Sequence, residues 1–246
     1  IGFVVGEQAI AVIDTGGSYR TGSALRAAIR ARSSLPIRYV INTHVHSDHI
    51  FGNAAFAQDQ PEFIGHHKLP AAMRARGAQY EENLNRMLGE AAQGSRVVLP
   101  TRTVQDTLSI DLGARTLTLR AWPAAHTDHD LSVMDERTRT LWTGDLLFVE
   151  RAPSVEGDLQ GWLDVMQRLA ASGATTMVPG HGPAVKDAQA RLQEQRRYLQ
   201  ALQDDVRAGI AAGHSLAQVT ARAAAAERKR WTLFDSVNAR NAEFLY

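Results

Sequence analysis

The chain has 246 residues and a formal net charge of +1, and it contains no cysteine. The near-neutral charge gives no reason to expect nucleic acid or an anionic membrane as a partner, and the absence of cysteine excludes disulfides, thiolate ligands and cysteine nucleophiles. No apolar run approaches the ~18 residues of a membrane-spanning helix. The length fits one large domain, or a domain with a helical appendage.

The first elements expected are a β-hairpin and a helix. Residues 2–6 and 9–13 are two short β-rich runs, and a glycine-containing turn follows at 14–17. Residues 21–32 have helical apolar spacing, and residues 37–42 form an apolar strand. The chain opens inside the first strand without a starting Met and shows no signal peptide, so we expect an N-terminal piece, which could include a leader, to precede Ile1.

A long polar helix is expected next. After a short helix from 53 and a strand at 62–65, the pattern from 69 to 94 is helical. This segment is long for a connection, so we interpret it as a lid or flank over a site. Its apolar residues are spaced for one buried face: Met73, Tyr80, Leu84, Met87 and Leu88.

The remaining chain is expected to form strands followed by helices. Predicted strands are 97–99, 106–110, 116–121, 131–134, 140–142 and 175–178, with a helix over 159–171. From 187 to 226 the sequence is almost wholly helical, with a break near Gly213. Its apolar stripe favours core packing: Leu192, Leu199, Leu202, Val206 and Ile210.

The most informative stretch is residues 43–49, which follow the apolar strand at 37–42. It places His44, His46, Asp48 and His49 within a few residues. Neutral imidazole and carboxylate are the usual ligands of zinc and similar first-row metals. His44 and His46 are two residues apart, so an extended backbone sends both side chains to one side. Asp48 and His49 fall where the chain turns and can reach a second metal.

Three further ligand-type residues each follow a predicted apolar strand. His126 comes after 116–121, Asp145 after 140–142, and His181 after 175–178, each in or beside a turn rich in Gly or Pro. A single His or Asp in a turn is usually a solvated or hydrogen-bonding residue. Together with the H-x-H-x-D-H run, the three predict a binuclear metal centre.

With these motifs, and with Asp14-Thr15-Gly16, the chain resembles the metallo-β-lactamase superfamily. The resemblance implies an α/β fold, a four-layer αβ/βα sandwich, with residues 1–185 as the catalytic domain and 186–246 as a C-terminal helical extension packed on it. It also implies that His44, His46 and His126 hold one metal, that Asp48, His49 and His181 hold the other, and that Asp145 bridges both. The implied cofactor is two zinc ions, with iron or manganese as alternatives.

Several runs are similar to a narrower group, the zinc metallohydrolases associated with quinoprotein and sulfur-oxidation gene clusters. The runs are residues 49–56, 65–70, 125–128 and 144–150. This similarity favours an exported, periplasmic protein, although a cytoplasmic one is also compatible. One departure is His129, which stands where many members carry Gly. We prefer His126 as the ligand, and interpret His129 as a group that supports a ligand or faces the substrate.

The chemistry implied is hydrolysis of an ester-like bond, such as a thioester, lactone, β-lactam or phosphoester, by a metal-bound hydroxide that Asp48 orients. Asp145 counts against a dedicated β-lactamase, because those members generally lack the bridging carboxylate. Thioesterases of the glyoxalase II type share a run similar to residues 144–148 but differ after His181. The alternatives are an iron oxidoreductase of the persulfide dioxygenase type, with His44, His126 and Asp145 as ligands, and a non-catalytic metal-binding protein of a redox or sulfur pathway.

The sequence leaves two smaller features open. Residues 66–68 either line the pocket or form a solvated turn. Trp122, Phe148 and Trp162 either wall the pocket or pack in the core, whereas His214 at the expected helix break is interpreted as structural.

Overall fold

The computed structural model describes residues 1–246, which form two compact units. The first unit comprises residues 1–121 and 131–138, and the second comprises 122–130 and 139–246. Both strands and helices are present, so the mixed α/β character is as predicted. No helix combines the length and the hydropathy that crossing a bilayer would require.

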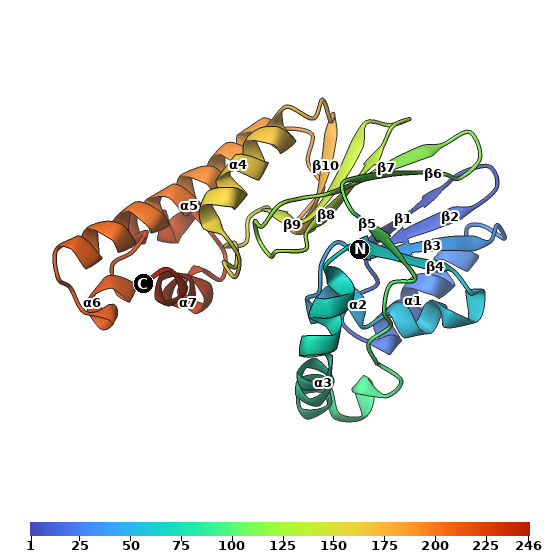
Figure 1. The fold of residues 1–246 in the computed structure, drawn as a ribbon, viewed down its shortest axis with the longest axis horizontal. Coiled ribbons are helices and arrows are strands. Elements are labelled where there is room, and N and C mark those ends of the chain that lie inside the picture. Colours follow the sequence, from blue (N-terminus) through green and yellow to red (C-terminus); the bar gives the residue numbers. More distant parts are fainter. The chain divides into compact units, whose positions relative to one another are not determined.

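The first unit is built on a sheet with the order β1-β2-β3-β4-β5 (Figure 1). Strands β1 and β2 form the predicted antiparallel hairpin, and β2 to β5 run parallel. Because β2, β3 and β4 are parallel, their carboxyl ends meet at one edge, from which the residues that follow them project. The strands are β1 (Gly2–Val5), β2 (Ile10–Ile13), β3 (Ile37–Ile41), β4 (Glu62–His66) and β5 (Arg102–Val104).

Helix α1 (Tyr19–Arg30) covers one face of this sheet. Ser18 caps it by accepting a hydrogen bond from the backbone N–H of Thr21 at 3.1 Å. Its buried Ile29 packs against Ile10 and Val12 of β2. The unit also contains a short helix α2 (Ser47–Ile50), a 3₁₀ helix (Asn53–Asp59), the long helix α3 (Leu69–Leu88) and a 3₁₀ turn (Gly89–Ala92).

Strands β6 (Thr107–Asp111), β7 (Thr116–Ala121) and β8 (Leu131–Asp135) pair antiparallel in this order. The turn between β6 and β7 is joined to the first hairpin, because Gln8 N–H donates to the carbonyl of Leu112 at 2.8 Å. The predicted strand at 97–99 is wrong: these residues are irregular, and β5 forms at 102–104 instead. The backbone N–H of Val97 donates to the Glu81 carboxylate of α3 at 2.8 Å, so this group bonds to a side chain and not to a strand.

The second unit pairs β9 (Thr140–Phe148) in parallel with β10 (Thr176–His181). Helix α4 (Leu159–Ala170) begins at Asp158, whose carboxylate caps the N–H groups of Gln160 and Gly161. The predicted helical region beyond 187 is confirmed with its break, as α5 (Ala188–Ala211) and α6 (Leu216–Thr220). The sequence pattern missed α7 (Phe234–Leu245), which follows a 3₁₀ helix (Ala225–Arg230).

Helix α5 supports the end of β9 through one buried side chain, Gln195. Its amide oxygen accepts from Phe148 N–H at 2.7 Å, and its amide nitrogen donates to the Leu146 carbonyl at 2.9 Å. The indole N–H of Trp162 donates to the same carbonyl at 2.9 Å. Buried backbone groups need such partners, so two helices satisfy the part of β9 that follows Asp145.

Candidate metal centre

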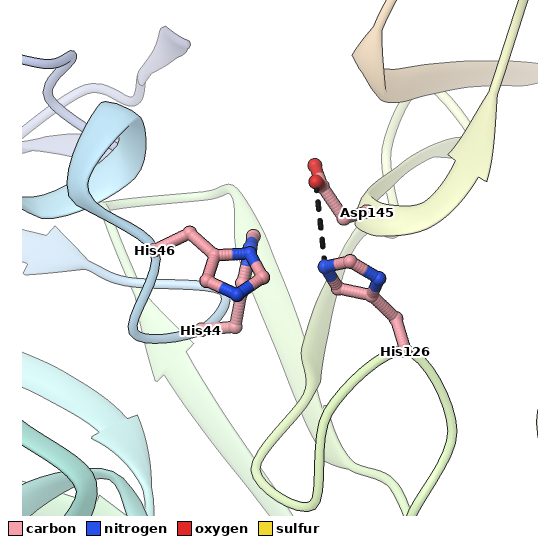
Figure 2. A group of neighbouring side chains, drawn as sticks. All are labelled: His44, His46, His126 and Asp145. Atoms are coloured by element: carbon pink, nitrogen blue, oxygen red, sulfur yellow. Dashed lines mark hydrogen bonds and ion pairs between the residues drawn. The ribbon is translucent and has the colours of Figure 1, made fainter. Parts of the chain in front are cut away.

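The first group of candidate ligands lies after β3, in the first unit. The chain leaves the strand at Ile41, stays non-helical to His46 and then enters α2. Nε2 of His44 lies 3.0 Å from Nδ1 of His46 (Figure 2). His44 is fully buried, and two imidazole nitrogens this close suit a shared positive ion.

Asp48 and His49 follow on α2. Oδ2 of Asp48 lies 3.6 Å from Nε2 of His49, and the His44 and His49 rings are 4.2 Å apart between centroids. The Asp48 side chain is 53% exposed, whereas that of His49 is 4% exposed. The four residues of the H-x-H-x-D-H run are therefore gathered in one place, and the carboxylate is the member open to solvent.

Two residues outside the predicted ligand set orient these imidazoles. Asp14, which follows β2, has Oδ2 2.8 Å from Nδ1 of His49 and 2.8 Å from Oγ1 of Thr43. Thr43 Oγ1 lies in turn 3.0 Å from Nδ1 of His44. A carboxylate on Nδ1 favours the Nδ1–H tautomer, so Nε2 of His49 is the nitrogen able to bind a metal. The sequence feature that could have identified Asp14 as a supporting residue is its position directly after β2, the strand next to β3.

A buried amide cluster fixes the backbone around His49. Asn42 and Asn53 exchange side-chain hydrogen bonds at 2.7 and 3.1 Å. The Thr15 hydroxyl donates to the Asn53 side-chain oxygen at 2.8 Å, and Thr15 N–H donates to the His49 carbonyl at 2.9 Å. Asn42, Thr15 and Asn53 are all fully buried, and this network holds the turn that carries the ligands.

The second group of candidate ligands belongs to the second unit and consists of His126, Asp145 and His181. Oδ2 of Asp145 lies 3.5 Å from Nε2 of His126 and 3.3 Å from Nε2 of His181 (Figure 2 draws the first pair). Nδ1 of His126 lies 2.9 Å from the carbonyl of Ser154, the geometry of a donated N–H. One carboxylate oxygen thus faces Nε2 of two histidines.

Aromatic rings enclose this second group. The His126 ring is edge-on to Trp162 and Phe148, at centroid distances of 5.2 and 5.8 Å, and the His181 ring stacks on Phe148 at 5.1 Å. Phe148 and Trp162 are both buried. Phe148 and Trp162 therefore both pack in the core and line the candidate ligands, the two roles that the sequence left as alternatives.

The structure corrects the expected positions of Asp145 and His181. Asp145 lies within β9, which continues to Phe148, and His181 is the last residue of β10. Both strands shift register here, between Val178 and Pro179 and again before His181. A Cβ on Gly180 would lie 1.8 Å from Oδ1 of Asp145, so only glycine fits beside this carboxylate. The Gly and Pro residues that predicted turns at these positions therefore mark irregular strand ends instead.

Of the two histidines in the 122–130 segment, His126 is the one beside Asp145. Nδ1 of His129 lies 2.7 Å from the neighbouring Asp128 carboxylate, and His129 is buried. Of residues 66–68, His66 ends β4 and is buried, whereas His67 and Lys68 form a turn in which His67 is half-buried, stacked on His66 at 4.2 Å, and Lys68 is exposed. His214 lies at the predicted helix break, where its carbonyl accepts from the Tyr246 hydroxyl at 3.0 Å.

The His and Asp side chains at and beside these strands form groups able to hold a metal ion, as in a metal-binding α/β protein. The model of the metallo-β-lactamase superfamily matches residues 1–181. The chain therefore belongs to the metallo-β-lactamase superfamily, as its motifs predicted.

Solved structures confirm the sandwich fold. A metallo-β-lactamase from Pontibacter korlensis is 20% identical and superposes with a TM-score of 0.66, over 80% of this chain and 85% of its own. A double mutant of the sec-alkyl sulfatase PisA1 is 16% identical with a TM-score of 0.71, over 89% of this chain and 41% of its own. At these identities the likeness shows the fold alone.

Two curated relatives are longer than this chain. The beta-lactamase-like protein 2 homolog of Caenorhabditis elegans is 27% identical over 71% of this chain and 52% of its own length. A linear primary-alkylsulfatase of a Pseudomonas strain is 24% identical over 72% of this chain and 40% of its own length. The chain thus spans about half of these relatives or less.

Proposed function

We propose that this protein is a binuclear metal-dependent hydrolase that cleaves an ester-like bond in a small molecule. The observation that carries the proposal is Asp145, whose Oδ2 faces Nε2 of both His126 and His181 within 3.5 Å. In the ligand scheme of the family these histidines serve different metals, so a carboxylate oxygen near both has the position of a bridge. The proposed ligands are His44, His46 and His126 for one metal and Asp48, His49 and His181 for the other, with Asp145 shared.

The residues present fit a metal of the zinc type. The donors are imidazole nitrogens and carboxylates, without thiolate, which suits zinc and also iron or manganese. Nδ1 of His49 meets the Asp14 carboxylate and Nδ1 of His126 meets a backbone carbonyl, the supporting contacts that metal-binding histidines usually have. A bound divalent metal lowers the pKa of a water ligand from about 15.7 to about 7 and polarises the bond under attack.

The protein's own residues orient the reaction and move protons. Asp48 is exposed enough to meet a substrate, and its carboxylate can accept a proton from the attacking water and pass it to the leaving group. For an acyl substrate, water adds to the acyl carbon, the bond to the leaving oxygen, sulfur or lactam nitrogen breaks, and the leaving atom takes that proton; for a phosphate or sulfate ester, water adds to phosphorus or sulfur and the ester oxygen leaves with the proton. The buried rings of Phe148 and Trp162 limit water around Asp145 and His181.

The substrates to screen are thioesters, lactones, β-lactams and phosphoesters. Two similar proteins are named as alkylsulfatases, so sulfate esters join the set. The bridging role of Asp145 argues against dedicated β-lactam hydrolysis. The narrower resemblance to periplasmic metallohydrolases supports an exported location, and fractionation of the producing cell would test it.

Metal content per chain, measured on protein purified without added metal, tests the proposal directly. Nearly two zinc ions per chain, with hydrolysis that chelation removes and zinc restores, would support it. One iron per chain with oxygen uptake on a persulfide would replace it with the dioxygenase alternative. A fully metallated protein that hydrolyses none of the screened classes would favour a binding protein.

A further inference from the structure

Helix α3 packs on the ligand-bearing loop of its own unit over only part of its length. Near its start, Leu69 and Met73 are buried against Val45, between His44 and His46, and against Ile50 of α2. The predicted apolar face continues along the helix, but burial does not. Met87 is 78% exposed and Leu88 is 41% exposed. The prediction of a wholly buried face is therefore wrong for the last turns of α3.

The unburied end of this face borders a cavity that reaches a candidate ligand. The cavity has a volume of about 340 Å³, in the range of small-molecule sites. Ser47 and Asp48 lie on its α2 side. Five residues of α3, spaced along one helix face, form the opposite wall: Tyr80, Asn83, Leu84, Met87 and Leu88.

The two walls differ in chemistry, and this difference selects a ligand. The α2 side presents a carboxylate, whereas the α3 side is mainly apolar, with Leu84, Met87 and Leu88 beside the polar groups of Tyr80 and Asn83. No Lys or Arg lines the cavity, so it offers no positive charge to pair with a second anionic group on a ligand. The unbranched Met87 side chain is flexible and can adapt to the path of an alkyl chain.

We propose that this cavity binds the apolar, unbranched acyl or alkyl tail of the substrate while the bond to be cleaved lies at Asp48. The assignment rests on the proposed hydrolase function, and it names the substrate class as esters with a medium-length aliphatic chain. In the complex the substrate tail covers Met87 and Leu88, so these residues at the end of α3 help to select the substrate.

Binding of hydroxamates tests the assignment without turnover. The hydroxamate head chelates a metal, and only octanohydroxamate carries a tail that reaches α3, whereas acetohydroxamate does not. Calorimetry on the metallated protein should show octanohydroxamate binding more tightly by on the order of fiftyfold, since each buried methylene contributes about twofold or more. Leu84→Gln/Met87→Gln should reduce this ratio about tenfold.

Two variants serve as controls. Ile210→Gln places the same polar amide at another exposed helical position and should leave the ratio unchanged. Met87→Leu keeps an apolar wall and should keep most of the tail preference. A second readout follows the five methionine methyl groups by ¹³C NMR, where the resonance missing from Met87→Leu should move with octanohydroxamate and not with acetohydroxamate.

The outcomes separate this assignment from the function on which it rests. Equal affinity for both hydroxamates would overturn the tail site and leave the metal centre in place. A protein that takes up no metal when zinc is supplied, and then binds neither hydroxamate, would overturn the proposed function and the assignment together. A dimer that dissociates in Met87→Gln, with no tail preference, would show that a second copy of the chain covers α3 instead.

Discussion

The carboxylate of Asp14 lies 2.8 Å from Nδ1 of His49, although 35 residues separate them. Its other oxygen accepts from the backbone N–H of Thr43 at 2.9 Å. One side chain from the end of β2 therefore fixes both the ring of a proposed ligand and the start of the loop that carries the others.

Asp14→Asn should lower zinc affinity by about 10- to 100-fold while the protein stays folded. All the neighbours of the carboxylate are donors, and an amide places an NH₂ group against one of them. The backbone adds no complication, because Asp14 has φ +52° and Asn tolerates that conformation. Competition with a chelator measures the affinity, and the exposed Asp106→Asn is the matched control. Unchanged affinity in Asp14→Asn would refute the orienting role.

Asp48→Asn should reduce kcat by about 10²-fold or more, because an amide cannot accept the proton that the mechanism assigns to this carboxylate. Asp48→Ala and His46→Ala should abolish hydrolysis with little change in melting temperature, since neither residue is part of the core. Rates on whichever substrate the wild type cleaves, together with circular dichroism, check this. Full activity in any of these variants would contradict the mechanism.

Gly180→Ala should disrupt the second ligand group. The added Cβ would lie 1.8 Å from Oδ1 of Asp145 and 2.8 Å from the Gly144 carbonyl carbon, so the carboxylate must move. We expect less metal per chain and a loss of activity. Gly213→Ala is the control, because nothing lies within 4 Å of its Cβ and its cost is limited to about 1–2 kcal/mol for a φ of +73°. Equal metal content in both variants would contradict the prediction.

Asn241 on α7 should position the His126 ring without contacting it, through the backbone around Ser154. Its amide donates to the Pro153 carbonyl at 2.7 Å and accepts from Val155 N–H at 3.0 Å, and between them Ser154 carries the carbonyl that meets Nδ1 of His126. Asn241→Leu leaves two buried backbone groups without these bonds, so we expect a loss of about 2–3 kcal/mol in unfolding free energy and weaker metal binding.

A second substitution separates the two effects of Asn241. Tyr198→Phe, which removes the hydroxyl that accepts from the Asn241 amide at 2.9 Å, should destabilise the protein by about 1 kcal/mol without weakening the metal site. Denaturant unfolding and zinc competition on both variants test the difference. An equal effect of the two substitutions on metal affinity would argue against positioning by Asn241.

Asp59 should make the protein sensitive to acid. Burial raises the pKa of this carboxyl, but hydrogen bonds from Arg26 and Arg30 lower it further, so the net pKa lies below its usual value. A carboxyl with a depressed pKa in the folded state stabilises it at pH values above about 4, and that contribution is lost as the pH falls through the folded-state pKa.

Asp59→Asn should therefore lower the melting temperature at pH 7 and weaken its dependence on pH below about 4. The expected loss at neutral pH is about 2 kcal/mol, the scale of hydrogen bonds to a charged group. Thermal unfolding at a series of pH values measures both effects, with the exposed Glu243→Gln for comparison. If Asp59→Asn lowered the melting temperature at pH 3 as much as at pH 7, the role given to the charged Asp59 carboxylate would be contradicted.

Much of the architecture was predictable because apolar periodicity reports burial. Helix α1, the first hairpin and strands β3, β4, β7 and β8 lie close to their predicted limits, since their core faces decide their conformation. The strand at 97–99 was wrong because a short apolar run carries no information about its hydrogen-bond partner. In the structure, the carboxylate of Glu81 takes the N–H of Val97.

The candidate ligands could be named from residue type and spacing, but their support could not. Asp14 and Ser154 act on His49 and His126 through contacts that join segments distant in the chain, and no local pattern encodes such a contact. The exposure of Met87 was unpredictable for a related reason. Helical spacing shows which residues share a face, but not where the surface beneath that face ends.

The two hydrogen bonds of Gln195 bear on how this protein could be shortened or recombined. The predicted catalytic domain ends at residue 185, yet Leu146 and Phe148, close to Asp145 on the same strand, take a buried partner from residue 195. A fragment that stops at 185 would expose these groups and loosen the strand that presents Asp145. We therefore expect relatives that keep the proposed metal ligands to keep the C-terminal helices as well. A chimera that exchanges these helices between relatives should keep Gln195 and β9 from the same protein.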